Sequence, residues 1–341
     1  MTLMLLLATI IALILSVAPH PISAAAAARY HVLVGVDGLG GEYLQQAVTP
    51  TMDQLSSQGS QVLNMQDVIT TSSSQNWMSM IAGSSPDQHG VYENDWEVGD
   101  SLPTETIFSL LRRHRPNATI AAFHQWTDFA RLVEPGVVDV MESPGDEDET
   151  MAAAVAFVAS TAHPAPDFLF VHLDNVDHAG HTLTWGSTPY LNAINKADRL
   201  IGDLVAALDA RGVLNDTAFF ISADHGGNFF THGPDTQVCR YIPFIASGSG
   251  IRRQAALTRE VRIFDVAATL AASMGLTRPA SWIARPVYEF LEPFSPLPAP
   301  AQKLVVRMVT EYEWIYDTSG LRGAPSHFVP SFSNTLFLSP R

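Results

Sequence analysis

Short apolar runs that alternate with longer amphipathic segments limit the fold of this chain more than any other feature. The run Tyr30–Val36 is continuous and rich in β-branched residues, which is typical of a strand buried on both faces of a parallel sheet. Further runs of this kind occupy residues 62–68, 118–123, 168–173, 218–222 and 242–246. Strands alternating with helices predict an α/β fold, a sandwich with a central, mostly parallel sheet flanked by helices.

Helix boundary signals separate these runs. Thr49 precedes a helix that has Pro50 in its first turn and Gly59 after its end. The acidic run 146–149 fits the first turn of a helix, where negative charge is favourable. The longest predicted helix begins at Thr188-Pro189.

The two ends of the chain differ from this pattern. Residues 1–28 contain an apolar stretch of about sixteen residues followed by small residues, which predicts a cleaved secretory signal, with a signal anchor as the alternative. We therefore expect a secreted protein or one of the secretory-pathway lumen, without a stable membrane span if the signal is cleaved. Residues 29–291 form the predicted α/β domain, and residues 292–341 form a Pro-rich linker and C-terminal extension.

Composition excludes several classes of protein. The 341 residues include 34 Asp and Glu against 19 Lys and Arg, giving a net charge of −15 that argues against coating nucleic acid. Cys239 is the single cysteine, so an internal disulfide and a thiolate-rich zinc site are both excluded. Any metal must be held by carboxylates and by some of the 12 histidines.

Three apolar runs end in residues that can bind metals. Asp37 follows the first run, the segment 174–181 with Asp177 and His181 follows another, and Asp224-His225 follows a third, with His232 shortly after. Because the carboxyl ends of parallel strands meet at one edge of a sheet, we expect these side chains to converge. Any one of them alone would fit a cap or a turn, but the joint pattern predicts a site for zinc or a similar divalent ion.

A Ser/Thr-rich segment, residues 70–77, lies between the run 62–68 and a predicted helix 76–82. A hydroxyl at a helix N-terminus lies beside free backbone N–H groups and the positive end of the helix dipole, where phosphate oxygens bind. Alone, this segment would fit an ordinary N-cap.

Together these motifs resemble the type I phosphodiesterase/nucleotide pyrophosphatase family of the alkaline phosphatase superfamily, over roughly residues 30–291. The resemblance rests on the following segments: Val36-Asp37-Gly38, residues 49–55, Ser73-Ser74-Gln75-Asn76 with Gly83, His89-Gly90-Val91 with Asn94, Asp177-His178-Ala179-Gly180-His181, and Asp224-His225-Gly226. It implies an alkaline phosphatase-like catalytic domain that binds two divalent ions, with zinc as the expected metal.

The resemblance also implies a set of ligands. One ion would be held by Asp177, His181 and His232, and the other by Asp37, Asp224 and His225. His327 is the alternative to His232 as the third ligand of the first ion.

Ser73 would be the nucleophile and also a metal ligand, with Ser72 and Ser74 as alternatives because Gln75 stands where the family usually has proline. Asn76 would donate a hydrogen bond to a phosphate oxygen.

The predicted function is hydrolysis of phosphate esters, either phosphodiesters and nucleotide pyrophosphates or phosphomonoesters, through a phosphoserine intermediate. A small phosphorylated molecule is the expected substrate. The alternatives are a sulfate or phosphonate hydrolase on the same fold and an inactive secreted binding protein. The Cys or Ser followed by x-Pro-x-Arg that sulfatases need for maturation is absent from the sequence.

Overall fold

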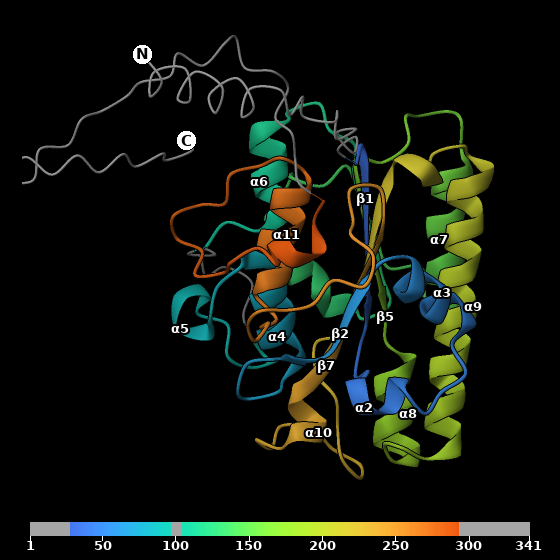
Figure 1. Ribbon diagram of the computed structural model, residues 1–341. Helices are drawn as coiled ribbons and strands as arrows, with labels where there is room; N and C mark the ends of the chain where they lie inside the picture. The colour runs from blue at the N-terminus through green and yellow to red at the C-terminus, as the bar shows by residue number, and fades with distance from the viewer. Residues whose placement is uncertain (1–27, 97–103, 293–341) are drawn as a thin grey trace, which may run out of the picture. The chain divides into compact units, whose positions relative to one another are not determined.

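The computed structural model describes residues 28–96 and 104–292, and these residues are built around one sheet of seven strands (Figure 1). The strands are β1 (Tyr30–Val36), β2 (Ser60–Gln66), β3 (Ile120–His124), β4 (Val140–Glu142), β5 (Phe168–Leu173), β6 (Thr217–Ser222) and β7 (Tyr241–Gly248). Their order is β2-β7-β6-β1-β5-β3-β4. Only β7 runs against its neighbours, so the predicted, mostly parallel α/β sandwich is confirmed.

The register of the central strands brings the predicted site together. Val36 of β1 lies opposite Leu173 of β5, and Gly35 lies opposite Ser222 of β6. The backbone N–H of Asp37 continues the ladder by donating to the carbonyl of Leu173 (2.8 Å). The residues that follow these three neighbouring strands therefore leave the sheet side by side at its carboxyl edge.

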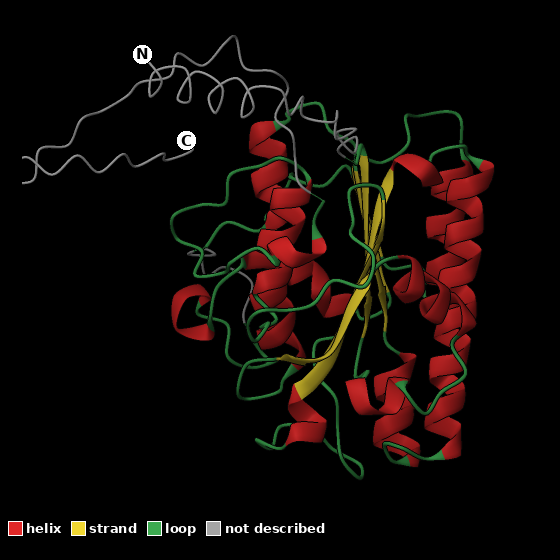
Figure 2. Ribbon diagram, in the orientation of Figure 1, coloured by secondary structure: helices red, strands yellow, loops and turns green. Residues whose placement is uncertain are grey.

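Helices cover both faces of the sheet (Figure 2). One face carries α4 (Ser73–Ala82), α5 (Pro86–His89), α6 (Ile107–His114) and α11 (Asp265–Ser273). The other face carries α3 (Pro50–Gln58), α7 (Glu147–Ala159), α8 (Asn175–Leu183) and α9 (Thr188–Ala210). Two single-turn helices, α2 (Gly41–Leu44) and α10 (Gln237–Arg240), complete the α-helices among the described residues.

Most helix boundaries follow the capping signals. Pro50 occupies the first turn of α3, and Asp146 forms a capping box with Glu149 at the start of α7. Helix α4 is longer than predicted: it begins at Ser73 with Ser72 as its N-cap residue, rather than at Asn76. Helix α8 was missed because its Asp, His and Gly residues are weak helix formers.

The predictions for residues 1–28 and 292–341, including His327, fall almost entirely outside the described residues, so they stay predictions. Within the part of the chain that the structure describes, none of the helices combines the length and apolar character needed to cross a membrane.

His89 joins α4 to α5 in a way that fixes the state of its ring. The backbone N–H of Val91 donates to His89 Nδ1 (3.1 Å), so Nδ1 carries no proton and Nε2–H donates to Ser79 Oγ (2.9 Å). Burial lowers the pKa of His89 to about 3, because a charged ring would be desolvated here.

This arrangement predicts a loss of stability in acid. The folded pKa lies below the unfolded value of about 6.5, so the stabilisation by neutral His89 is complete above pH 6.5 and is lost as the pH falls. We expect the stability difference between wild type and His89→Gln to shrink by about 2–3 kcal/mol from pH 7 to pH 4.5. Urea unfolding at both pH values measures it. The exposed His114 provides the control, and an equal shrinkage in His114→Gln would contradict the assignment.

Candidate active site

Asp37 leaves β1 at the centre of the site and uses only one of its oxygens within the protein. Its Oδ2 accepts hydrogen bonds from Trp77 Nε1 (3.0 Å) and His172 Nε2 (3.1 Å), whereas its buried Oδ1 has no partner. Burial acts to raise the pKa of Asp37, but the bond from His172 and the nearby His225 outweigh it and lower this pKa to about 2. Asp37 is therefore an anchored carboxylate with one free oxygen.

Asp224, after β6, is arranged in the same way. The backbone N–H of Gly38 donates to its Oδ1 (3.1 Å), and its buried Oδ2 has no hydrogen-bond partner. Gly38 has a φ of +69°, and a β-carbon there would lie 2.7 Å from Asp177 Cα, so only glycine allows the loop after β1 to approach helix α8 so closely. Burial, together with the charge of Asp37, raises the pKa of Asp224 well above its usual value.

Helix α8 presents Asp177 and His181 one turn apart on the same face, with Asp177 Oδ2 3.4 Å from His181 Nε2. The buried Oδ1 of Asp177 has no partner. Burial and the carboxylates of Asp37 and Asp174 raise the pKa of Asp177 to about 9. The site thus concentrates more negative charge than it can hold without a cation.

Three histidines turn the same nitrogen toward these carboxylates. His181 Nδ1 lies 2.9 Å from the carbonyl of Phe230, and His225 Nδ1 lies 2.9 Å from that of Gly226. His232 Nδ1 contacts the carbonyl of Thr71. Because a carbonyl only accepts, each Nδ1 must carry the proton, and each Nε2 of a neutral ring keeps a lone pair for a metal.

These donors fit the chemistry of divalent cations. His225 Nε2 lies 3.3 Å from Asp224 Oδ2 and 3.6 Å from Asp37 Oδ1, and burial lowers the pKa of His225 to about 3. The lone pair of neutral His225 Nε2 therefore faces carboxylate oxygens, and all of these atoms are acceptors. A cation bound between them would stabilise this arrangement.

Two groups of residues hold ligand atoms within 4.8 Å of one another around these positions: Asp177 with His181 and His232, and Asp37 with Asp177 and His225. A third such group joins Asp37 to His172 and Asp174. The structure brings all six predicted ligands together, and Asp177 belongs to both of the first two groups. The assignment of ligands to individual ions stays a prediction.

Ser73 is the first residue of α4 and is nearly buried, with its Oγ 3.4 Å from His225 Nε2. The neighbouring serines are arranged differently. Ser72 Oγ donates to the carbonyl of Tyr92, and the backbone N–H of Ser74 donates to Asn94 Oδ1 (2.9 Å). Of these three serines, Ser73 is therefore the one whose hydroxyl contacts the cluster.

Asn76 does not face this space. Its Oδ1 accepts from the backbone N–H of Val68 (2.9 Å), and its Nδ2 contacts the carbonyls of Val68, Thr70 and Ser72. The side chain is fully buried and pins the loop before α4. The expectation that Asn76 donates to phosphate does not match this geometry. Asn94 is exposed beside the helix N-terminus, and its Nδ2 makes no hydrogen bond to another described residue.

Sequence reasoning missed the residues that anchor Asp37. His172 is absent from the predicted site, although it lies one strand position from the carboxyl edge and points to the same centre. Its position in an otherwise apolar strand, two residues before Asp174, was the available signal. Trp77 gave no such signal, because tryptophan in a helix usually indicates core packing.

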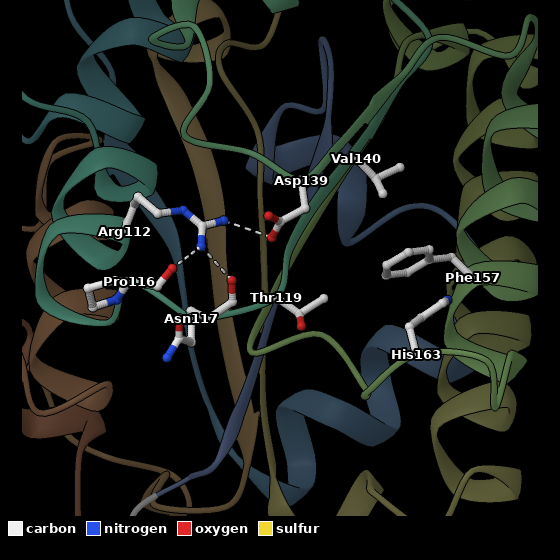
Figure 3. A pocket seen from close by; sticks show the side chains of 9 residues that line it. Arg112, Pro116, Asn117, Thr119, Asp139, Val140, Phe157 and His163 are labelled. Carbon is white, nitrogen blue, oxygen red and sulfur yellow. Dashed lines mark hydrogen bonds and ion pairs between the residues drawn. The ribbon is translucent and has the colours of Figure 1, made fainter.

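A separate pocket of about 410 Å³ lies at the amino ends of β3 and β4, the opposite end of these strands from the site (Figure 3). Arg112 dominates it but already donates to the carbonyls of Pro116, Ala118 and Val137 and to Asp139. On the other wall the ring of Phe157 stacks on that of His163, with their centroids 4.1 Å apart. These contacts give the pocket a structural explanation.

Solved structures define the class of protein. The fold matches murine ectonucleotide pyrophosphatase/phosphodiesterase 5 with a TM-score of 0.65 at 15% identity, over 77% of this chain and 100% of that one. It also matches alkaline phosphatase PafA with a TM-score of 0.63 at 12% identity, over 79% of this chain and 100% of that one. The fold is thus alkaline phosphatase-like. Within that class, the chain belongs to the type I phosphodiesterase / nucleotide pyrophosphatase family, whose model matches residues 31–237.

Curated relatives agree with this family. Ectonucleotide pyrophosphatase/phosphodiesterase family member 1 of Mus musculus is 24% identical over 213 residues, covering 57% of this chain and 24% of the relative. Venom phosphodiesterase of Macrovipera lebetinus is 21% identical over 213 residues, covering 57% and 25%. The chain therefore spans about a quarter of the length of these relatives.

The anchoring of Asp37 can be tested by removing one donor. Trp77→Phe keeps most of the packing but deletes the N–H bond to Asp37 Oδ2, so we expect zinc affinity to fall about 10–100-fold. Competition with a chromophoric chelator measures it. Trp282→Phe is the matched control, because Trp282 is equally buried and donates to the carbonyl of Glu105. Equal losses of affinity in both variants would show that packing alone is responsible.

Proposed function

We propose that this protein is a metal-dependent hydrolase of phosphate esters in which Ser73 is the nucleophile. The observation that carries the proposal is the cluster of six acceptor side chains, one of which, His225, contacts the Ser73 hydroxyl at the N-terminus of α4. Three buried carboxylate oxygens there have no partner in the protein, as expected for oxygens that bind metal. Membership of the phosphodiesterase family supports phosphodiesters and nucleotide pyrophosphates as the class of substrate.

The cations would be held by Asp37, Asp177, His181, Asp224, His225 and His232, and zinc suits this mixture of imidazole and carboxylate. When bound, two such ions would supply the positive charge that lowers the pKa of the Ser73 hydroxyl and neutralises the phosphate.

Ser73 Oγ, having lost its proton, would attack phosphorus while the bond to the leaving oxygen breaks in line with it. The product is a phosphoserine on Ser73, which water then hydrolyses to release phosphate or a phosphate monoester and regenerate the hydroxyl.

We assign the phosphate-oxygen donor to Asn94 rather than Asn76. Asn94 is held by the N–H of Ser74, the residue after the nucleophile, which aligns its amide with the N-terminus of α4. Its Nδ2 is exposed and is not used by other described residues, whereas the amide of Asn76 is used up by the backbone. Donors of this kind stabilise charge that develops on the phosphoryl oxygens.

Sulfate hydrolysis is the second candidate function. A putative sulfatase from Bacteroides thetaiotaomicron has the same fold, with a TM-score of 0.63 at 15% identity over 77% of this chain and 74% of that one. The maturation motif is absent from the sequence, and Cys239 is buried within α10, so phosphate hydrolysis is favoured. Phosphonate hydrolysis would use the same metal ligands, and an inactive binding protein would keep the fold without turnover.

We also propose that the protein acts outside the cytosol. The apolar N-terminal segment supports export, and the names of the relatives describe ectoenzymes and venom enzymes.

The nucleophile is tested by Ser73→Ala. We expect hydrolysis of bis(p-nitrophenyl) phosphate to fall at least about a thousandfold, because no hydroxyl remains to attack, while the purified protein still binds about two zinc ions. Steady-state rates and metal analysis measure the two quantities. Ser74→Ala is the control and should keep its activity. Retained turnover in Ser73→Ala would move the nucleophile to Ser72 or Ser74, and hydrolysis of p-nitrophenyl sulfate alone would select the sulfatase reading.

The roles of the two asparagines can be separated. Asn94→Ala should lower kcat/KM about a hundredfold, because it removes an exposed donor to the transition state, and it should cost at most about 1 kcal/mol of stability through the lost acceptor of the Ser74 N–H. Asn76→Ala should instead lower the free energy of unfolding by about 1–3 kcal/mol, because it orphans the backbone N–H of Val68. Kinetics and urea unfolding of both variants decide between them. A catalytic loss confined to Asn76→Ala would restore Asn76 as the donor.

A further inference from the structure

Exposed apolar side chains gather around the candidate active site. Among the described residues, eight large hydrophobic side chains are exposed, and five of them lie on segments that carry or flank site residues. We call these five the apolar rim: Ile69, Tyr92, Leu183, Phe229 and Phe230. Single exposed apolar residues are common, but adjacent ones beside a polar site, such as Phe229 and Phe230, can mark a surface that a ligand covers.

The most exposed members stand on one tight turn. Asn228 and Thr231 exchange backbone hydrogen bonds (2.9 and 3.2 Å), leaving Phe229 and Phe230 at the tip with 73% and 58% of their surface exposed. Phe229 has a φ of +53°, at the turn position where glycine is preferred. A bulky residue in this left-handed conformation is unfavourable, and such outliers occur mainly at functional sites.

This turn is tied to the metal ligands through its backbone. The carbonyl of Phe230 accepts from His181 Nδ1 (2.9 Å), and the carbonyl of Phe229 accepts from the N–H of Trp185 (2.8 Å). His232, the next ligand along the chain, contacts the carbonyl of Thr71 in the loop before Ser73. The turn therefore lies beside the cluster.

Leu183 ends α8, and the nucleophile side contributes the other two members of the rim. Ile69 lies in the loop before α4, and the carbonyl of Tyr92 accepts from Ser72, the N-cap residue of that helix.

We propose that the apolar rim, and above all Phe229 and Phe230, forms a subsite for an alkyl group esterified to the phosphate. This inference rests on the proposed function, because it assigns the non-phosphoryl part of the substrate of the same site. The turn is hydrogen-bonded to His181 and is therefore part of the candidate active site. We accordingly favour part of the substrate, rather than a separate partner protein, as the group that covers its two rings. Burial of each methylene contributes up to about 0.8 kcal/mol, or about fourfold in kcat/KM if it is realised in the transition state.

The test compares p-nitrophenyl methyl phosphate with p-nitrophenyl hexyl phosphate. For the zinc-loaded wild type we expect kcat/KM to rise at least about tenfold from methyl to hexyl. In the double variant Phe229→Gly with Phe230→Ser the rise should disappear, while the methyl ester reacts within about twofold of wild type. These residues suit the observed turn, so its backbone bonds to His181 and Trp185 should persist. Tyr288→Ser, which removes an exposed ring elsewhere, is the control and should keep the rise.

Other outcomes overturn the subsite. A wild type indifferent to chain length, or a double variant that keeps the rise, would exclude it. Equal losses on both esters would show that the turn acts only by positioning His181. If the double variant lost binding to phosphatidylcholine vesicles but kept the rise in kcat/KM from methyl to hexyl ester, the turn would instead be a membrane-binding surface.

A binding measurement separates the subsite from the proposed function. Calorimetry with methylphosphonate and hexylphosphonate on zinc-loaded Ser73→Ala does not depend on turnover. Tighter binding of hexylphosphonate that Phe229→Gly with Phe230→Ser abolishes would support the subsite even if no phosphate ester were hydrolysed. Equal binding of the two phosphonates would overturn it even in an active enzyme.

Discussion

The pair of hydrogen bonds that fixes Asp37 Oδ2 is the interaction on which the rest of the site depends. Trp77 and His172 hold one oxygen, so the other is left without a partner at the point where His225 and Asp224 converge. Buried acceptors that face one another are unfavourable unless a cation lies between them. The protein core thus supplies the packing that keeps an electrostatically unfavourable arrangement in place for metal binding.

The sheet and two helices convert this arrangement into a reactive geometry. Parallel pairing of β6, β1 and β5 aligns the strand ends, so their carboxylates meet without long loops. Helix α8 adds Asp177 and His181 from one face, and α4 presents the Ser73 hydroxyl at its positive end. Rigid elements therefore position both the proposed metal ligands and the proposed nucleophile, which is the condition for preorganised catalysis.

Much of this was predictable from sequence, because strand ends carry their chemistry in the linear order of residues. The strand 30–36 and the capped helix at Pro50 followed local patterns, and the convergence of the six predicted ligands followed from strand ends and family motifs. The direction of the Asn76 amide, which bonds to the backbone before α4, did not follow, because a motif position does not reveal which way an amide points. His172 was missed for a related reason: its role depends on pairing between strands that are 135 residues apart in the chain.

The loops around the site form one connected unit rather than separate attachments. His232 links its own segment to the carbonyl of Thr71 in the nucleophile loop, and His181 links α8 to the carbonyl of Phe230 in the aromatic turn. The bonds that select the metal-binding nitrogen of each histidine are therefore the bonds that place the nucleophile and the apolar rim. Because these bonds are made by backbone carbonyls, a change in the backbone of either loop would alter the orientation of the histidines, whereas a side-chain substitution that keeps the turn would alter the proposed substrate contact alone. The strained turn that carries Phe229 and Phe230 is thus held between His225 and His232 by its backbone bonds to His181 and Trp185, and its two rings stay free to contact a substrate.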